Sequence, residues 1–258
     1  MRSKIIFLFL LAIFSSVELA WGFFPDIEEV NARWLKNLNS LNAFQVVCTY
    51  DLEEKLSVRL WQKGNLWREE WTIQVKGQNK VVWAGLGRGQ EVILAYPELK
   101  LKPRPVLNFW RKDLNWWIIR GLDTNLLSYQ FLQYTPCLVL GGESLQIWLD
   151  NNLMLPVRLV FGDGGDNFDF NWSKYHQIGN FWLPKKMSIV HQTQNWECTF
   201  EWRGINIDLP DELFSPQGFQ NRFERLNNSS IPSEILTLMK VLARAHETIN
   251  IEHATANP

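Results

Sequence analysis

The chain has 258 residues, enough for one large domain or two small ones. Its 26 basic and 27 acidic residues nearly balance, which argues against a nucleic-acid partner because such proteins usually carry a basic excess. Fourteen Trp and sixteen Phe instead predict a large aromatic core, a large apolar cavity, or both.

Residues 1–22 have the pattern of a secretory signal peptide. Arg2 and Lys4 form a positive start, and the apolar run 5–14 is too short to span a bilayer. Ala20 and Gly22 are small residues at the expected cleavage site. We expect export and cleavage after about Gly22, with an uncleaved membrane anchor as the alternative. No Cys lies near this point, so the sequence has no lipid-attachment site.

An amphipathic helix is predicted to follow, from Asp26 to about Leu41. Asp26 is a good N-cap, and Glu29 lies three residues further on. One apolar stripe recurs at helical spacing, formed by Ile27, Val30, Trp34, Leu38 and Leu41. The stripe must pack on a larger body.

After Phe44 the apolar period becomes two, which is typical of strands. The predicted strands cover 44–52, 56–62, 66–75, 81–84, 91–96, 137–140, 145–149, 157–161, 168–172, 182–190 and 196–207. Short polar turns between them favour an antiparallel meander. The run 85–89 is interpreted as a hairpin turn, because no helix follows it to form a phosphate site. Segments 115–119 and 124–133 are predicted as short helices.

Three strands place aromatic side chains on one face. These rows are Trp67, Trp71, Ile73 and Val75; Phe168, Phe170 and Trp172; and Trp196, Cys198, Phe200 and Trp202. We infer a curved sheet with an aromatic inner surface and a polar outer surface. Glu69 shares the aromatic face, which places it at a rim unless the register differs there. Alternation alone leaves open whether the rows fill a core or line a ligand cavity.

The tail from Gln217 has a different pattern. Residues 227–230 are interpreted as a linker, and Pro232 suits the first position of a helix. Its apolar stripe is Ile231, Ile235, Leu238, Leu242, Ala245 and Ile249. This helix could pack on the domain, cover an opening or meet a partner. The expected organisation is a signal peptide (1–22), one domain (23–216), and a linker with a C-terminal amphipathic helix (217–258).

No catalytic or metal pattern is evident in the sequence. The four His residues lack metal-ligand spacing, and no Gly-x-Ser-x-Gly nucleophile turn occurs. We therefore expect no enzyme, no metal and no cofactor, with an envelope hydrolase as the weakest alternative. Cys48, Cys137 and Cys198 are interpreted as small buried hydrophobic residues, although export would permit one disulfide.

Four short segments resemble the periplasmic lipoprotein-carrier family LolA and its outer-membrane relative LolB. The segment 60–67 (LWQKGNLW) is similar to the family's Leu-Trp-x-Lys-Arg-Pro-Asn-Leu-Phe hairpin, and 89–97 (GQEVILAYP) to its Asp-Gly-x-x-Leu-Trp-x-Tyr-x-Pro strand. Tyr175 with Leu183-Pro184 is similar to the LolB-type ending, and 207–214 (IDLPDELF) to the superfamily's closing segment. The resemblance covers roughly residues 26 to 216.

The resemblance implies an α+β, mostly β fold: a half-open antiparallel β-barrel capped by helices. Its concave apolar face would receive lipoprotein acyl chains or lipid in the periplasm, without enzymatic activity. The implied ligand-binding residues are Trp67, Trp71, Ile73, Phe168, Phe170, Trp172, Phe200 and Trp202. The alternative is an envelope sensor resembling the LolA-like half of RseB, whose C-terminal helix engages an envelope protein.

Two features depart from the family pattern. The hairpin Arg that holds the carrier's lid closed falls at or beside Gly64 here. This difference puts the carrier's opening mechanism in question. The simplest carriers also have no counterpart of the C-terminal helix.

Overall fold

A computed structural model describes residues 24–162, 165–226 and 231–251. The expected signal peptide and the expected linker at 227–230 lie outside the described residues, so these two predictions stay predictions. No helix among the described residues is long and apolar enough to cross a membrane.

The described residues form one twelve-stranded antiparallel sheet and a small two-stranded sheet. In spatial order the large sheet contains β5 (Glu91–Tyr96), β4 (Gln78–Arg88), β3 (Leu66–Val75), β2 (Leu56–Lys63), β1 (Ala43–Tyr50), β14 (Gln194–Ile205), β13 (Lys186–His191), β10 (Phe168–Ser173), β9 (Pro156–Phe161), β8 (Leu145–Asp150), β7 (Thr135–Gly141) and β6 (Leu127–Leu132). The small sheet pairs β11 (His176–Ile178) with β12 (Phe181–Leu183).

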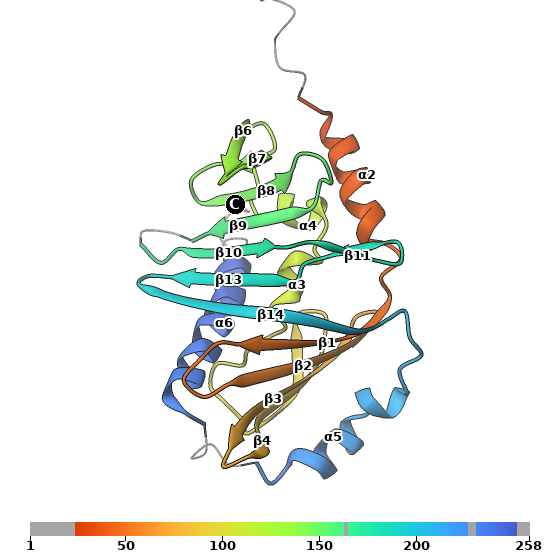
Figure 1. The fold of residues 1–258 in the computed structure, drawn as a ribbon, viewed down its shortest axis with the longest axis vertical. Coiled ribbons are helices and arrows are strands. Elements are labelled where there is room, and N and C mark those ends of the chain that lie inside the picture. Colours follow the sequence, from red (N-terminus) through yellow and green to blue (C-terminus); the bar gives the residue numbers. More distant parts are fainter. Residues whose placement is uncertain (1–23, 163–164, 227–230, 252–258) are drawn as a thin grey trace, which may run out of the picture.

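One long-range pairing joins the two halves of the large sheet. β1 pairs with β2 on one side and with the last strand, β14, on the other. All other neighbours are close in sequence, as expected for meanders joined by short turns. β5 and β6 end the sheet without pairing to each other, so the sheet curls without closing (Figure 1). The predicted half-open antiparallel barrel is therefore confirmed.

Helices cover both faces of the sheet. They are α2 (Ile27–Leu38), α3 (Leu107–Trp110), α4 (Leu114–Ile118), the 3-10 helix η2 (Asp211–Phe214), α5 (Pro216–Phe223) and α6 (Ser233–Ile251). In Figure 1, α3, α4 and α6 lie on the far, concave side, while α5 lies at the lower end beyond β3 and β4. α2 is fixed to the small sheet because Asn37 exchanges two hydrogen bonds with the backbone of Trp182, at 2.9 and 2.7 Å.

Three sequence predictions need correction. Residues 127–132 form strand β6, not a helix, because Leu127, Tyr129 and Phe131 alternate with polar residues and pair with β7. The predicted strand 182–190 is divided into β12 and β13 at Pro184, which has no N–H to donate to a ladder. The Gly-rich run 85–89 lies largely inside β4, and only its end belongs to the turn.

Candidate functional site: the concave face

The concave face carries one continuous apolar core. All three predicted aromatic rows contribute to it, as do apolar residues of most other strands and of α2, α3, α4 and α6. Rings from different strands meet here: Trp71 contacts Trp83 edge-on at 5.9 Å between centroids, and Phe161 stacks on Phe168 at 5.3 Å. The parity predicted for the rows is therefore confirmed.

Each predicted ligand-binding residue has a defined place on this face. Fully buried are Trp67, Trp71, Ile73, Phe168, Phe170, Trp172 and Phe200. Trp202 is half-buried at the margin, where its indole Nε1 donates to the Pro184 carbonyl at 2.9 Å. Val75, expected on the same face, is exposed beyond the margin. Whether these residues bind a ligand stays a prediction.

Glycines in β4 make room for two tryptophan rings. A Cβ added at Gly87 would lie 2.2 Å from Trp67 Cζ2 and 2.3 Å from the Glu91 carbonyl oxygen. A Cβ added at Gly85 would lie 2.2 Å from Trp83 Cη2. The rings therefore occupy the space that a side chain would fill, which explains glycines in a strand interior, where they are otherwise unfavourable.

Helices fill the concavity in this conformation. Phe109 of α3 packs on Phe170 at 5.0 Å and on Phe161 at 5.6 Å between centroids. The remaining gap between Trp34, Trp117 and Trp172 is too narrow for a water molecule. Most side chains of the aromatic rows are therefore packed against helices. Trp172 also lines a cavity of about 590 Å³, together with Tyr175 and Lys186.

α6 contributes much of this filling. Its buried side chains are Ile235, Leu238, Met239, Val241, Leu242, Ala243, Ala245, His246 and Ile249. His246 stacks on Phe109 at 4.1 Å, and burial together with nearby Arg104 and Lys112 lowers its pKa well below the usual value. Outside the core, Arg244 Nη2 pairs with Asp166 Oδ2 at 2.6 Å, in the turn before β10. Of the roles left open by the sequence, packing on the domain is the one observed.

Glu69 places a carboxyl group on the apolar, concave face of the sheet. It is 3% exposed, and its Oε2 accepts a hydrogen bond from Trp71 Nε1 at 3.3 Å. Burial raises the pKa of Glu69 to about 8, with the Trp71 hydrogen bond acting in the opposite direction. The register predicted for β3 is therefore right, but Glu69 is buried within the core instead of lying at a rim. At neutral pH the group is mostly a neutral acid.

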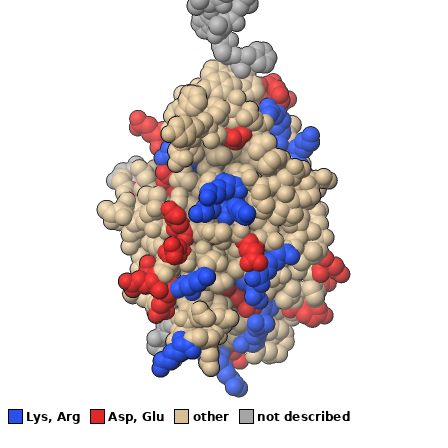
Figure 2. Space-filling model, in the orientation of Figure 1, with Lys and Arg blue, Asp and Glu red and all other residues tan. Residues whose placement is uncertain are grey.

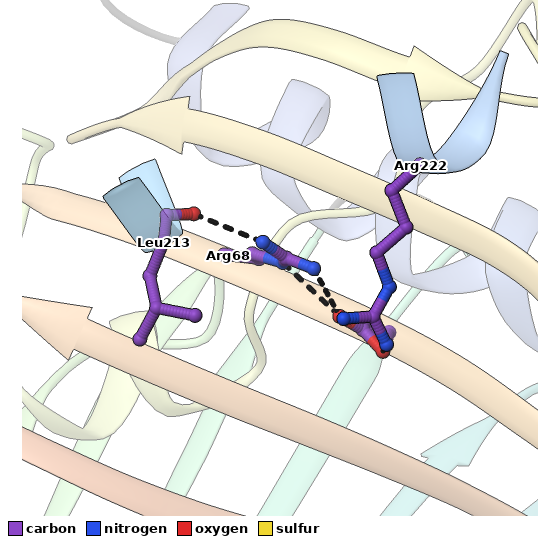
Figure 3. Close-up of polar contacts among 4 residues, drawn as sticks. Arg68, Leu213 and Arg222 are labelled. Carbon is purple, nitrogen blue, oxygen red and sulfur yellow. Dashed lines mark hydrogen bonds and ion pairs between the residues drawn. The ribbon is translucent and has the colours of Figure 1, made fainter. Parts of the chain in front are cut away.

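The opposite face of β3 carries a buried ion cluster that the sequence did not reveal. Arg68 Nε donates to Glu70 Oε1 at 3.1 Å, and Arg68 Nη1 donates to the Leu213 carbonyl at 3.2 Å (Figure 3). Arg222 of α5 pairs with Glu70 Oε2 at 3.2 Å. The Arg68 guanidinium also lies 5.1 Å from the Phe223 ring. The cluster fixes α5 to the outer face, which the sequence predicted to be polar without predicting that a helix covers it.

The three cysteines are buried and unpaired, as the sequence analysis favoured. Burial raises the pKa of Cys48 well above its usual value, and nearby Cys198 and Glu69 act in the same direction. Tyr175, a residue of the LolB-like motif, accepts a hydrogen bond from Trp110 Nε1 at 2.7 Å and so connects α3 to the sheet. Among the described residues, no cluster of three or more His, Cys, Asp or Glu could hold a metal ion.

The fold has counterparts among solved structures. A LolA superfamily protein from Nitrosomonas europaea matches 75% of this chain and 99% of its own, with a TM-score of 0.51 and 14% identity. The chain has a LolA-like fold. A DUF1329 family protein from Desulfovibrio piger matches 74% of this chain and 97% of its own, with a TM-score of 0.51 and 15% identity. At these identities the likeness concerns the fold alone. No family model and no curated protein matches the sequence.

Proposed function

We propose that this LolA-like protein is a non-enzymatic periplasmic carrier that binds lipoprotein acyl chains or lipid on the concave face of its sheet. The observation that carries the proposal is the continuous apolar face of a half-open barrel, to which separate strands contribute aromatic rows. Acyl chains need no hydrogen bonds, so a face of Trp and Phe suffices to bind them. The expected signal peptide and the fold support a place in the cell envelope.

Because helices fill the concavity, a ligand must displace one of them. α6 is the best candidate, since no strand of the sheet follows it among the described residues. α3 and α4 continue into the fold on both sides, so their departure would pull on β5 and β6. Exchange of α6 for a ligand therefore leaves the sheet pairing intact.

The energies of the two occupants are comparable in scale. Burying an acyl chain contributes about 0.8 kcal/mol per CH₂ group, or roughly 12 kcal/mol for a chain of about 16 carbons. Six of the buried α6 side chains are Ile, Leu, Met or Val, which contribute about 1.5–3 kcal/mol each, or roughly 9–18 kcal/mol together before ordering costs. The burial free energies of the acyl chain and of α6 are therefore of similar size. A carrier must release its cargo, so its ligand and α6 should be able to replace each other.

Photo-crosslinking tests the proposal and locates the site. The protein, purified from the cell envelope, is first examined by native mass spectrometry for bound lipid, then loaded with a diazirine fatty acid and illuminated. We expect labels on β3, β10 and β14, at inward-facing residues such as Trp71, Phe170 and Phe200. Labels confined to outward-facing residues, or no lipid and no uptake, would contradict the proposal.

The RseB-like alternative gives α6 a different role, as the helix that engages an envelope protein. In this structure the apolar stripe of α6 packs against the sheet, and only a narrow polar strip containing Lys240, Arg244 and Glu247 is exposed. Deleting residues 227–258 separates the two hypotheses. The alternative predicts loss of partner pull-down with lipid uptake intact, whereas the carrier proposal predicts easier lipid uptake.

A further inference from the structure

Exposed apolar side chains gather at one end of the molecule. Among the described residues, ten large hydrophobic side chains are exposed, and seven of them come from the start of the described chain or from residues 118–134. We call these seven the apolar tip: Phe24, Ile118, Ile119, Leu126, Tyr129, Phe131 and Tyr134. Tyr134 is 97% exposed and Phe131 is 73% exposed. Such a concentration is unusual for a surface that faces only water.

The apolar tip is built from three segments. Phe24 stacks on Tyr129 of β6 at 5.1 Å between centroids, which joins the start of the described chain to the β6–β7 hairpin. Ile118 ends α4, and the chain runs from there through Leu126 into β6. In Figure 1, β6 and β7 lie at the upper end, and α4 lies lower in the same half, behind the sheet and far from β4 and α5.

The hairpin of the apolar tip carries no charge. The sequence has no acidic or basic residue between Asp123 and Glu143, and in Figure 2 the surface at the position of β6 and β7 is mostly tan, with charged side chains around it. Edge strands exposed to water are normally protected by charged residues, especially Lys, and β6 lacks this protection. The β6–β7 edge is therefore adapted to surroundings other than bulk water.

Cations flank α4, whose last residue, Ile118, belongs to the apolar tip: Lys112 precedes this helix and Arg120 follows it. The Arg120 guanidinium lies 3.5 Å from the Trp116 ring centroid, and Lys112 Nζ lies 5.2 Å from it. Burial lowers the pKa of Lys112, and the positive charges of Arg111 and Arg120 lower it further, while Asp113 acts in the opposite direction. Three cations and one carboxylate therefore lie close together.

We propose that the apolar tip docks on the surface of a phospholipid bilayer. Tyr and Phe are residues that favour the membrane interface, and a basic cluster beside them suits lipid phosphates. A bilayer accounts for an apolar surface drawn from three segments, whereas a partner strand added to β6 would cover only the sheet edge. The proposal does not depend on the acyl-chain site, because the tip lies outside the concave core.

A probe at the tip tests the proposal directly. Tyr134→Cys is labelled with an environment-sensitive fluorophore in the envelope-purified protein and mixed with vesicles of phosphatidylethanolamine and phosphatidylglycerol. The native cysteines are buried and should remain unlabelled. We expect a blue shift for this probe and none for the same probe at Lys76→Cys, which lies at the exposed β3–β4 turn. An unchanged spectrum at position 134 would overturn the proposal.

Vesicle flotation supplies the matched comparison. Phe131→Ser with Tyr134→Ser should reduce binding by at least about tenfold, because two largely exposed aromatic rings no longer enter the interface. Ile93→Ser with Ile207→Ser, two exposed residues away from the tip, should leave binding unchanged. Equal flotation of both double variants, or a dimer seen by sedimentation in place of vesicle binding, would refute bilayer docking. Fatty-acid uptake by the tip variant should remain normal, so the two proposals fail separately.

Discussion

The buried carboxyl group of Glu69 should make the stability of the protein depend on pH. The pKa of Glu69 is about 8 in the folded protein and 4.5 in the reference state, so the folded state keeps a proton that the unfolded state loses between these values. The free energy of unfolding should therefore be highest below about pH 4.5 and should fall as the pH rises towards about 8. Between about pH 5 and pH 7 this group alone accounts for a loss of roughly 2–3 kcal/mol.

Glu69→Gln isolates this contribution. Glutamine keeps the shape and an oxygen acceptor for Trp71 Nε1 but does not ionise. Denaturant unfolding at several pH values should show that the variant loses the extra slope and is more stable than the wild type at about pH 7, by roughly 2–3 kcal/mol. Glu53→Gln, at an exposed position, is the control and should follow the wild type.

The outcome also reports on the state of the concave face. If the wild type and Glu69→Gln show the same pH dependence, the carboxyl group is hydrated. Water would then reach β3, and the reasoning that places Glu69 in a dry core is wrong. A carboxyl titration followed by NMR would give the same answer from a second observable.

Three further predictions concern other parts of the fold. Gly87→Ala should lower the free energy of unfolding, measured by denaturant unfolding, by about 1–3 kcal/mol, because the new methyl group collides with the Trp67 ring and the Glu91 carbonyl. Gly218→Ala is the control: its methyl group meets only ordinary contacts, so the stability should not change. Arg68→Ala should lower the free energy of unfolding by about 3–5 kcal/mol, because it leaves the buried Glu70 with only Arg222. It should also release α5, which would be seen as faster amide exchange at 216–223. Arg203→Ala removes an exposed ion pair and should lower the free energy of unfolding by less than about 1 kcal/mol. Arg244→Ala should change stability by at most about 1 kcal/mol but increase fatty-acid uptake, measured by titration, because it removes the ion pair between α6 and Asp166.

The inner face of the sheet could be predicted from the sequence because period-two alternation determines which side chains share a face. It placed Trp67, Trp71 and Glu69 on the correct face, although Glu69 was expected at a rim and is buried in the core. Arg68 and Glu70 lie on the predicted outer face, but their burial could not be predicted, since alternation cannot show that a later helix will cover a strand. β6 was mistaken for a helix although its alternation was present, because exposed edge strands are weakly patterned.

For the C-terminal helix, too, the sequence predicted the element but not the surface on which it packs. Its stripe predicted an amphipathic helix, and α6 confirms it at Ser233–Ile251. The partner of the stripe could not be predicted, since a helix that packs on its own sheet and a helix that binds another protein share the same spacing. The glycines of β4 are a related case, because only the structure shows that Trp67 and Trp83 lie across Gly87 and Gly85.

The central claim is that an acyl chain binds the concave face in place of α6. A bismaleimide cross-link between Asp166→Cys and Arg244→Cys, which replace an existing ion pair, would hold α6 against the sheet. Binding of a fluorescent fatty acid is then titrated for the linked and the unlinked forms of the same double variant. The account predicts saturable binding by the unlinked form and little or none by the linked form. Equal binding by both forms, or binding by neither, would contradict it.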